Sequence, residues 1–133
     1  MRHFLSLADL SAEEAREILQ LAIDGKRQYQ QGEQSRPMVG RTLALLFQKP
    51  SLRTRVSFEA GVNQLGGNTV FLSDDVGWGK RESMKDFSAV LSAYVDIIAC
   101  RARAHQDVIE LAEHASCPVI NALTDLCHPC QAL

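Results

Sequence analysis

The chain has 133 residues, 46% of them apolar, and its formal net charge is -2. This size and composition suit one globular domain and argue against disorder, and the small charge gives no indication of a nucleic-acid or membrane partner. No apolar run approaches the ~20 residues of a membrane helix, and the amino terminus lacks the apolar core of a signal peptide. We therefore expect a cytoplasmic protein in which Cys100, Cys117, Cys127 and Cys130 are thiols.

The first predicted element is an amphipathic helix that begins after Ser11 and ends near Gly32. Ser11 and Glu14 have the spacing of a capping box, in which each side chain accepts a hydrogen bond from the other residue's backbone N–H. Apolar residues then recur at helical spacing: Ala15, Ile18, Leu19, Ala22 and Ile23. This stripe predicts a helix that packs against the rest of the domain through one face.

Short apolar runs predict four strands, at residues 42–47, 69–72, 95–99 and 117–120. The first run is continuously apolar, which is typical of a strand covered on both faces. Helical segments alternate with these strands, at residues 53–65, from residue 84 onward, and at residues 106–115. The order predicts an α/β fold, namely a three-layer α/β/α domain with a doubly wound, four-stranded parallel sheet.

The helix that starts at residue 84 has Ser83 as its expected N-cap. Its expected packing side carries Met84, Phe87, Val90, Leu91 and Tyr94. Ligands of open parallel sheets bind beyond the carboxyl ends of the strands, so the residues that follow each strand are the candidates for a site.

Residues 49–55 (KPSLRTR) follow the first predicted strand and contain the main candidate. Pro50 resists helix continuation and Ser51 is a good N-cap, so a helix is expected to begin here with unpaired backbone N–H groups and the positive end of its dipole. Ser51 and Thr54 add hydroxyl donors, and Arg53 adds a planar fork suited to phosphate. Basic residues oppose the dipole unless an anion is bound, so the pattern indicates an anion site; a capped helix with solvated arginines is the alternative.

Two further candidates follow later strands. Arg101 and Arg103 come after the third predicted strand, and spacing alone leaves each of them either a ligand contact or a surface residue. In residues 128–131 (HPCQ), His128 can donate a hydrogen bond to a carbonyl oxygen that gains charge. Gln131 can hold an NH2 group through its side-chain oxygen.

Two other patterns are interpreted as structural. His105 and His114 lie in or beside a predicted helix and are expected to be exposed or packing residues. Cys127 and Cys130 have the C-x-x-C spacing of a redox dithiol or of half a zinc site. The motif lies after the last strand and no second pair at finger spacing accompanies it. A dithiol oxidoreductase remains an alternative, and it predicts a lowered pKa for one of these thiols.

Residues 51–55 (SLRTR) and 128–131 (HPCQ) together resemble the paired signatures of the aspartate/ornithine carbamoyltransferase family. The resemblance extends through residues 47–50 (FQKP), 56–60 (VSFEA), 64–67 (QLGG), 94–96 (YVD) and 118–123 (PVINAL). It therefore covers essentially the whole chain, and two spaced motifs in this context make it specific.

The resemblance implies a role for each residue of the first motif. Ser51, Leu52, Arg53 and Thr54 match the turn that grips the phosphate of carbamoyl phosphate. Leu52 stands where the family usually has Thr, and it would act through its backbone N–H. Arg55 is interpreted as an internal brace for the site rather than as a direct ligand.

The resemblance extends these roles to the ends of the later strands. Arg101 matches the arginine that contacts carbamoyl phosphate, His128 the histidine that polarises the carbonyl group, and Gln131 the residue that holds the carbamoyl NH2. Arg53, Arg101 and His128 are therefore the expected catalytic residues.

Family members also supply a carbamoyl-phosphate contact, often a Gln or Ser, from a neighbouring subunit through the loop before the third helix. The loop corresponds here to residues 76–83 (VGWGKRES). Gly77 stands where the polar side chain is expected. Trp78, Lys80 or Arg81 would have to replace it, or the loop is built differently.

Lys49, residues 65–67 and the HPCQ segment resemble the ornithine-specific members of the family more than the aspartate-specific ones. The implied reaction transfers the carbamoyl group of carbamoyl phosphate to the side-chain amine of ornithine and gives citrulline and phosphate. It implies a role in arginine biosynthesis, no metal or organic cofactor, and a homotrimer with shared sites.

Relatives continue from the HPCQ segment into a second domain that binds ornithine. We therefore expect residues 1–133 to form a carbamoyl-phosphate-binding domain that does not complete the transfer by itself. Two alternatives stay open, an aspartate carbamoyltransferase domain and a non-catalytic phosphate-binding module.

Overall fold

The computed structural model describes residues 1–33 and 35–133. Within these residues, the strands of the sheet are β1 (Thr42–Phe47), β2 (Asn68–Leu72), β3 (Ile97–Arg101) and β4 (Val119–Leu123). The helices are α1 (Ala12–Gln30), α2 (Leu52–Gln64), α3 (Met84–Tyr94), α4 (His105–His114) and α5 (Pro129–Ala132), with 3-10 turns η1 (Leu7–Asp9) and η2 (Asp74–Val76). In the described part of the chain, no helix combines the length and the apolarity needed to cross a membrane.

All described strand pairs are parallel, and the strands lie in the order β2-β1-β3-β4. The chain moves from β1 to one neighbour, β2, and then crosses back over β1 to β3 on the other side. The strand order therefore reverses between β1 and β3, which is the switch point where ligands of doubly wound sheets bind. The predicted doubly wound parallel sheet is confirmed.

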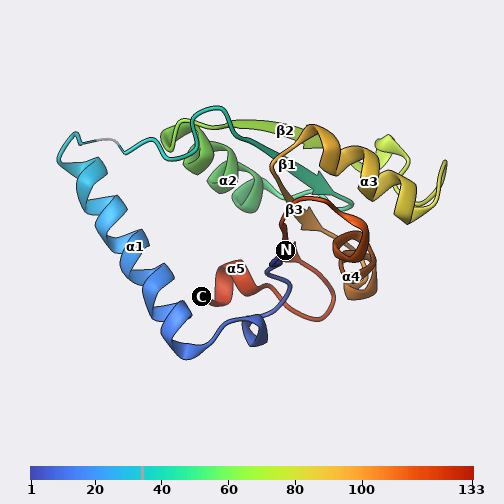
Figure 1. Ribbon diagram of the computed structural model, residues 1–133, viewed down its shortest axis with the longest axis horizontal. Helices are drawn as coiled ribbons and strands as arrows, with labels where there is room; N and C mark the ends of the chain where they lie inside the picture. The colour runs from blue at the N-terminus through green and yellow to red at the C-terminus, as the bar shows by residue number, and fades with distance from the viewer. Residues whose placement is uncertain (34) are drawn as a thin grey trace.

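The sheet separates two apolar cores, which makes the predicted three layers. One core packs β1, β3 and β4 residues such as Leu46, Ile98 and Val119 against α3 and α4. The other packs Leu45 and Ala99 against the α2 side. Figure 1 shows α2 on one side of the sheet and α3 and α4 on the other. Because β1 is buried on both faces, its continuous apolarity has a direct structural cause.

The amino-terminal segment adds a short parallel bridge to β4 that the sequence did not indicate. Phe4 pairs with Ile120, with hydrogen bonds from Phe4 N to Val119 O and from Asn121 N to Phe4 O, each 2.8 Å long. His3 accepts a hydrogen bond from Val119 N through Nδ1 at 3.1 Å. These contacts cover the edge of β4, whose backbone groups would otherwise lack protein partners.

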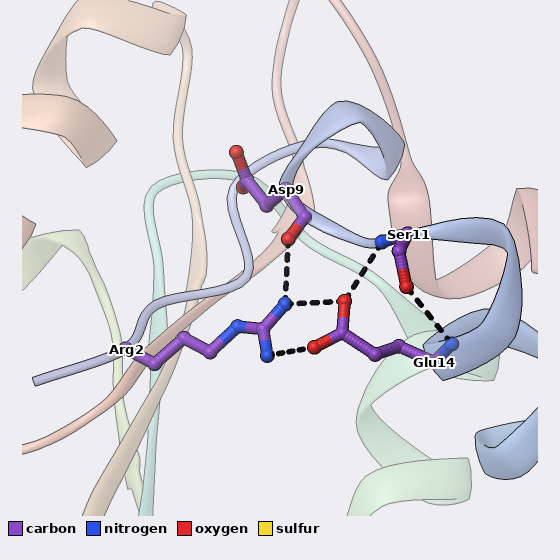
Figure 2. Close-up of polar contacts among 4 residues, drawn as sticks. All are labelled: Arg2, Asp9, Ser11 and Glu14. Carbon is purple, nitrogen blue, oxygen red and sulfur yellow. Dashed lines mark hydrogen bonds and ion pairs between the residues drawn. The ribbon is translucent and has the colours of Figure 1, made fainter.

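The start of α1 is fixed by the predicted capping box and by an ion pair. Ser11 Oγ accepts from Glu14 N at 3.2 Å, and the Glu14 carboxylate accepts from Ser11 N at 2.7 Å. Figure 2 shows that the same carboxylate pairs with Arg2, which also donates to Asp9 O at 2.8 Å. The hydrogen bonds from Arg2 and from Ser11 N lower the pKa of Glu14 from 4.5 to about 2.

The boundaries of two strands and the packing of α1 differ from the predictions. β3 begins at Ile97, two residues later than predicted, because Val95 is the C-cap residue of α3. Asp96 joins this strand end to β1, since its N–H donates to Thr42 O at 2.9 Å and its carboxylate accepts from Thr42 N at 2.8 Å. The same carboxylate pairs with Arg41 at 2.7 Å. β4 begins at Val119 and runs to Leu123, later than residues 117–120. No residue of α1 is buried, and Ile18 and Ile23 are 40% and 52% exposed, so the predicted packing of its apolar stripe is wrong for the described residues.

Helix α3 has the predicted cap but a rotated packing face. Ser83 Oγ accepts from Asp86 N at 3.1 Å. Val90 and Tyr94 are exposed, whereas Ser88 and Ser92 are buried. The serines are buried because each hydroxyl donates to a backbone carbonyl one turn earlier, at 2.6 Å, so neither carries an unpaired polar group into the core.

The Glu14 carboxylate should control the order of the start of α1. Glu14→Gln removes the Arg2 ion pair and weakens the capping box, so backbone amides in the first turn of α1 should exchange with solvent faster. In the unmodified chain the contribution of Glu14 is present above pH 4.5 and is lost as the pH falls towards 2, because folding lowers its pKa. Hydrogen exchange followed by NMR checks both effects.

Glu17→Gln is the matched control, since Glu17 lies in the same helix and is exposed. Equal exchange rates in Glu14→Gln and Glu17→Gln would contradict this role of the capping box.

Candidate functional site

Helix α2 begins beside the carboxyl end of β1, and its N-cap residue does not cap it. Ser51 has the extended backbone of an N-cap, with φ -158° and ψ 116°, but its hydroxyl accepts no hydrogen bond from the first turn. The Ser51 hydroxyl instead accepts from Arg101 Nη1 at 3.1 Å. The predicted N-cap position is confirmed and the predicted side-chain cap is wrong, because an arginine from β3 takes the hydroxyl.

The first turn of α2 therefore keeps the features of an anion site. Its backbone N–H groups lack a side-chain cap, and no acidic residue occupies the turn. Arg53 is exposed, and no described residue pairs with its guanidinium. The positive end of the helix dipole and an unpaired arginine repel each other unless an anion lies between them.

Arg101 is the last residue of β3 and lies beside the end of β1. Phe47 and Arg101 are register partners, and Gln48 N donates to Arg101 O at 2.9 Å. The Gln48 side chain also accepts from Arg103 N at 2.7 Å, which ties the loop after β1 to the loop after β3. Arg101 Nε is enclosed and has no hydrogen-bond partner among the described residues. An enclosed guanidinium N–H of this kind is available to a ligand oxygen.

The end of β4 is irregular next to Arg101. Its register shifts so that Cys100 pairs with Asn121 and Arg101 with Leu123, which leaves Ala122 as the extra residue of a bulge. Leu123 has φ 142°, a conformation that costs a residue other than glycine about 1–3 kcal/mol. Such strain is concentrated at functional sites, and Leu123 is one of the residues that line the cleft described below.

His128 follows this irregular strand end and stands at the N-cap position of α5. Its Nδ1 atom is enclosed and has no hydrogen-bond partner among the described residues. Burial lowers the pKa of His128 below 6.5, and the positive charge of Arg101 lowers it further. The imidazole is therefore neutral at pH 7, which lets it donate a hydrogen bond from one nitrogen without bringing a positive charge.

These segments enclose one cleft of about 920 Å³ at the switch point. All seven residues that the sequence singled out as ligand contacts line it: Ser51, Leu52, Arg53, Thr54, Arg101, His128 and Gln131. The first four come from the start of α2, Arg101 from the end of β3, and the last two from α5 and its N-cap. Residues separated by up to 80 positions in the chain thus meet in one place.

The cleft also has walls that the sequence analysis missed. Phe4, Ile120, Leu123, Phe58 and Leu133 add apolar surface, and Pro50, Ser57 and Cys130 complete the lining. Phe4 reaches the cleft only because the amino terminus pairs with β4, and no local sequence signal indicates that pairing. Ser57 and Phe58 lie in the second turn of α2, so the spacing of that helix was a usable signal.

The remaining candidates lie outside the cleft. Arg55 pairs with Glu59 at 3.0 Å, and its guanidinium lies 3.6 Å from the centre of the Phe71 ring, which agrees with a brace between α2 and β2. Arg103 pairs with Asp74 at 3.7 Å on the surface. His105 bonds Thr124 Oγ1 through Nδ1 at 3.0 Å, as expected of a packing residue.

Trp78, in the loop that follows η2, is one of the residues proposed to contact a neighbouring subunit, but it is buried. Trp78 is 5% exposed and stacks on Phe87, with ring centroids 6.3 Å apart. Because Trp78 packs into the apolar core of its own domain, its side chain is not free to reach a neighbouring subunit. Lys80 and Arg81 are exposed, although Lys80 pairs with Asp74 at 3.3 Å.

The C-x-x-C pair does not have the environment of a redox dithiol. Burial raises the pKa of the Cys130 thiol to about 11, and this thiol donates to Asn121 O at 3.3 Å. Cys127 donates to Leu5 O at 3.6 Å. A redox-active pair needs a thiol of lowered pKa in an electropositive setting, and Cys130 has the opposite shift.

The fold and the cleft have the features of an α/β domain with an anion site at the switch point of its sheet. Residues 2–133 match a family described as "Aspartate/ornithine carbamoyltransferase, carbamoyl-P binding domain". The chain belongs to this family.

Ornithine carbamoyltransferases are among the proteins that this chain resembles in sequence and structure. An ornithine carbamoyltransferase from Anoxybacillus flavithermus is 52% identical over 133 residues, which cover 99% of this chain and 42% of that protein. The solved structure of ornithine carbamoyltransferase from Pyrococcus furiosus is 46% identical with a TM-score of 0.96, over 98% of this chain and 42% of that chain. The solved structure of ornithine carbamoyltransferase from Burkholderia thailandensis is 42% identical with a TM-score of 0.94. The match covers 99% of this chain and 46% of that chain. The chain spans less than half the length of these relatives.

Removing the charge of Arg101 should raise the pKa of His128. Arg101→Gln removes the smaller of the two causes of the lowered pKa, whereas burial, the larger cause, remains. The pKa of His128 should therefore rise but stay below 6.5. Imidazole resonances followed by NMR against pH measure this value.

Arg103→Gln is the control, because it removes a nearby arginine that lies on the surface. An unchanged pKa of His128 in Arg101→Gln, or an equal rise in Arg103→Gln, would contradict the geometry of the cleft.

Proposed function

We propose that this chain is the carbamoyl-phosphate-binding domain of an ornithine carbamoyltransferase and that the cleft at the switch point holds carbamoyl phosphate. The observation that carries the proposal is the convergence of the uncapped first turn of α2, Arg101 and His128 on one cleft. A dianionic phosphate group satisfies the unpaired donors of that turn, and a neighbouring carbonyl group suits a neutral histidine.

The phosphate end of the ligand lies at the start of α2 in this proposal. The donors are the backbone N–H groups of Leu52 and its neighbours, the hydroxyls of Ser51 and Thr54, and the guanidinium of Arg53. Leu52 is 77% exposed, and its N–H belongs to the uncapped turn. The replacement of Thr by Leu at this position removes one hydroxyl and leaves the backbone donor.

The carbamoyl end lies between Arg101, His128 and Gln131. Arg101 is held towards α2 by its hydrogen bond to Ser51, and its enclosed Nε is free to donate. Neutral His128 donates to the carbonyl oxygen, which gains negative charge when the carbon is attacked. The Gln131 side-chain oxygen accepts from the carbamoyl NH2 group.

The proposed reaction forms a bond between the amine nitrogen of ornithine and the carbonyl carbon, and it breaks the bond from that carbon to the bridging phosphate oxygen. The leaving phosphate takes the electron pair of the broken bond and accepts the proton that the amine loses. Arg53 and Arg101 stabilise the charge on the departing phosphate, an electrostatic role that requires neither a metal nor an organic cofactor.

Ornithine is the preferred second substrate in this proposal. Lys49 and the HPCQ segment resemble ornithine-specific members, and the similar proteins from Anoxybacillus and Pyrococcus carry the name ornithine carbamoyltransferase. Ornithine would bind through a second domain beyond residues 1–133. We further propose a cytoplasmic homotrimer that serves arginine biosynthesis, in which Lys80 or Arg81 is the exposed candidate to contact a neighbouring subunit's ligand.

Arg53 should account for much of the affinity for carbamoyl phosphate. A charge-assisted bond to phosphate contributes about 1.5–3 kcal/mol, so Arg53→Gln should weaken binding by about ten- to hundred-fold. Isothermal titration calorimetry of the chain with carbamoyl phosphate measures the change. Arg16→Gln, a change of an exposed arginine in α1, should leave the affinity unaltered. Equal affinity in the Arg53 and Arg16 variants would contradict the proposed phosphate position.

The amine specificity requires the full-length protein. It should form citrulline from carbamoyl phosphate and ornithine, and should form no carbamoyl-aspartate from aspartate. Turnover of aspartate instead of ornithine would replace the proposal with the aspartate branch of the family. Binding of carbamoyl phosphate without turnover of either amine would indicate a non-catalytic phosphate-binding module.

A further inference from the structure

We propose that Asn121, a buried residue that does not line the cleft, is a positioning residue that holds Leu123 and the turn before His128 in the geometry of the site. This inference rests on the proposed function, because it concerns the same cleft. Asn121 lies in β4 and is fully buried, with 0% of its surface exposed. A fully buried amide is uncommon and stays in a core only when its donors and acceptors are paired.

The amide of Asn121 joins two segments that each contribute a residue to the cleft, namely Phe4 and Leu123. Its Oδ1 accepts from Leu123 N at 2.9 Å, and its Nδ2 donates to Leu5 O at 2.9 Å. The backbone of Asn121 adds a hydrogen bond from its N–H to Phe4 O at 2.8 Å. One residue therefore fixes both the amino-terminal segment that carries Phe4 and the strand end that carries Leu123.

The bond to Leu123 explains how an unfavourable backbone conformation persists. The bulge at the end of β4 removes Leu123 N from its normal ladder partner, and Asn121 Oδ1 supplies the acceptor instead. Leu123 O in turn accepts from Ala102 N at 3.0 Å, and Leu123 is the register partner of Arg101. A change at Asn121 would thus be transmitted through Leu123 to the backbone that carries Arg101.

The same amide lies against the turn that precedes His128. Asn121 Nδ2 is 3.4 Å from Cys127 Sγ and 3.5 Å from Cys127 O, and Asn121 O accepts from the Cys130 thiol at 3.3 Å. Thr124 holds the turn from within, since Thr124 N donates to Cys127 O at 3.0 Å. The residues on both sides of His128 and Pro129 therefore contact Asn121, and the enclosed Nδ1 of His128 has no described bond of its own to fix the ring.

A purely structural role for Asn121 predicts a different result from a positioning role. If Asn121 only fills the core, its replacement lowers stability and leaves the properties of His128 unchanged in molecules that remain folded. If Asn121 positions the site, its replacement lets His128 move away from Arg101 and towards solvent. The pKa of His128 must then rise towards 6.5, because both causes of its lowered value weaken.

The test compares Asn121→Ala with the unmodified chain in the absence of ligand, by NMR titration of the imidazole of His128. The expected result is a raised pKa for His128, together with binding of inorganic phosphate weakened about tenfold in calorimetry. Asn63→Ala is the matched control, since Asn63 is an exposed asparagine in α2 and its replacement should change neither value.

A second variant covers the case in which Asn121→Ala does not fold. Gly adopts the conformation of Leu123 without strain, so Leu123→Gly is the background in which the loss of Asn121 is tolerated best. Asn121→Ala in that background should again raise the pKa of His128 relative to Leu123→Gly alone, because the contacts with Leu5 and Cys127 are still lost. The rise should be smaller than in the unmodified background.

An unchanged pKa of His128 and unchanged phosphate affinity in either folded Asn121 variant would overturn the positioning role. If the proposed function itself is wrong, the result is different: the unmodified chain would bind neither carbamoyl phosphate nor inorganic phosphate. The ligand-free titration of His128 decides the role of Asn121 in both cases.

Discussion

The pairing of β1 with β3 is the constraint on which the rest of the site depends. Because these strands are parallel and adjacent, the residues that follow β1 and those that end β3 must meet at one edge of the sheet. The hydrogen bond from Arg101 to Ser51 spans this meeting point. It has two effects, since it orients the guanidinium towards α2 and leaves the first turn of α2 without its expected side-chain cap.

The cleft gathers polar groups that protein atoms do not satisfy. Arg101 Nε and His128 Nδ1 are enclosed without described partners, and the first turn of α2 opposes the charge of Arg53. An enclosed unpaired group costs about 1–3 kcal/mol, and the strained backbone of Leu123 adds to that cost. The proposed ligand offsets these costs, since a phosphate group supplies acceptors and negative charge where the protein has donors and positive charge. Unpaired polar groups and a strained backbone that lie together in one cleft are expected of a functional site.

Local sequence rules predicted the elements well because their causes are local. The capping box at Ser11 and Glu14 and the cap at Ser83 involve residues three positions apart. The alternation of strands and helices sufficed to predict a parallel, doubly wound sheet, and the structure adds the strand order. The rules failed where a distant residue intervenes. Ser51 does not cap α2, and its hydroxyl instead accepts a hydrogen bond from Arg101, 50 positions away.

The site residues were predictable to the extent that motifs and strand ends point to them. The seven predicted contacts meet in the cleft, whereas no sequence pattern pointed to Phe4. Asn121 and Leu123 belong to the segment 118–123 of the family resemblance, but the sequence assigned neither of them a role. Phe4 arrives through a pairing across more than a hundred positions, and the bulge that strains Leu123 depends on the register of β4 with β3. Such features follow from tertiary contacts rather than from the composition or the spacing of apolar residues along the chain.

The most direct test of the central claim is the NMR spectrum of the 15N-labelled chain during titration with carbamoyl phosphate. If the first turn of α2 holds the phosphate, the backbone amides of Leu52, Arg53 and Thr54 should shift downfield as they donate to it, together with changes at His128 and Gln131. Shifts confined to other surfaces, or no saturable change in the first turn of α2, would contradict it.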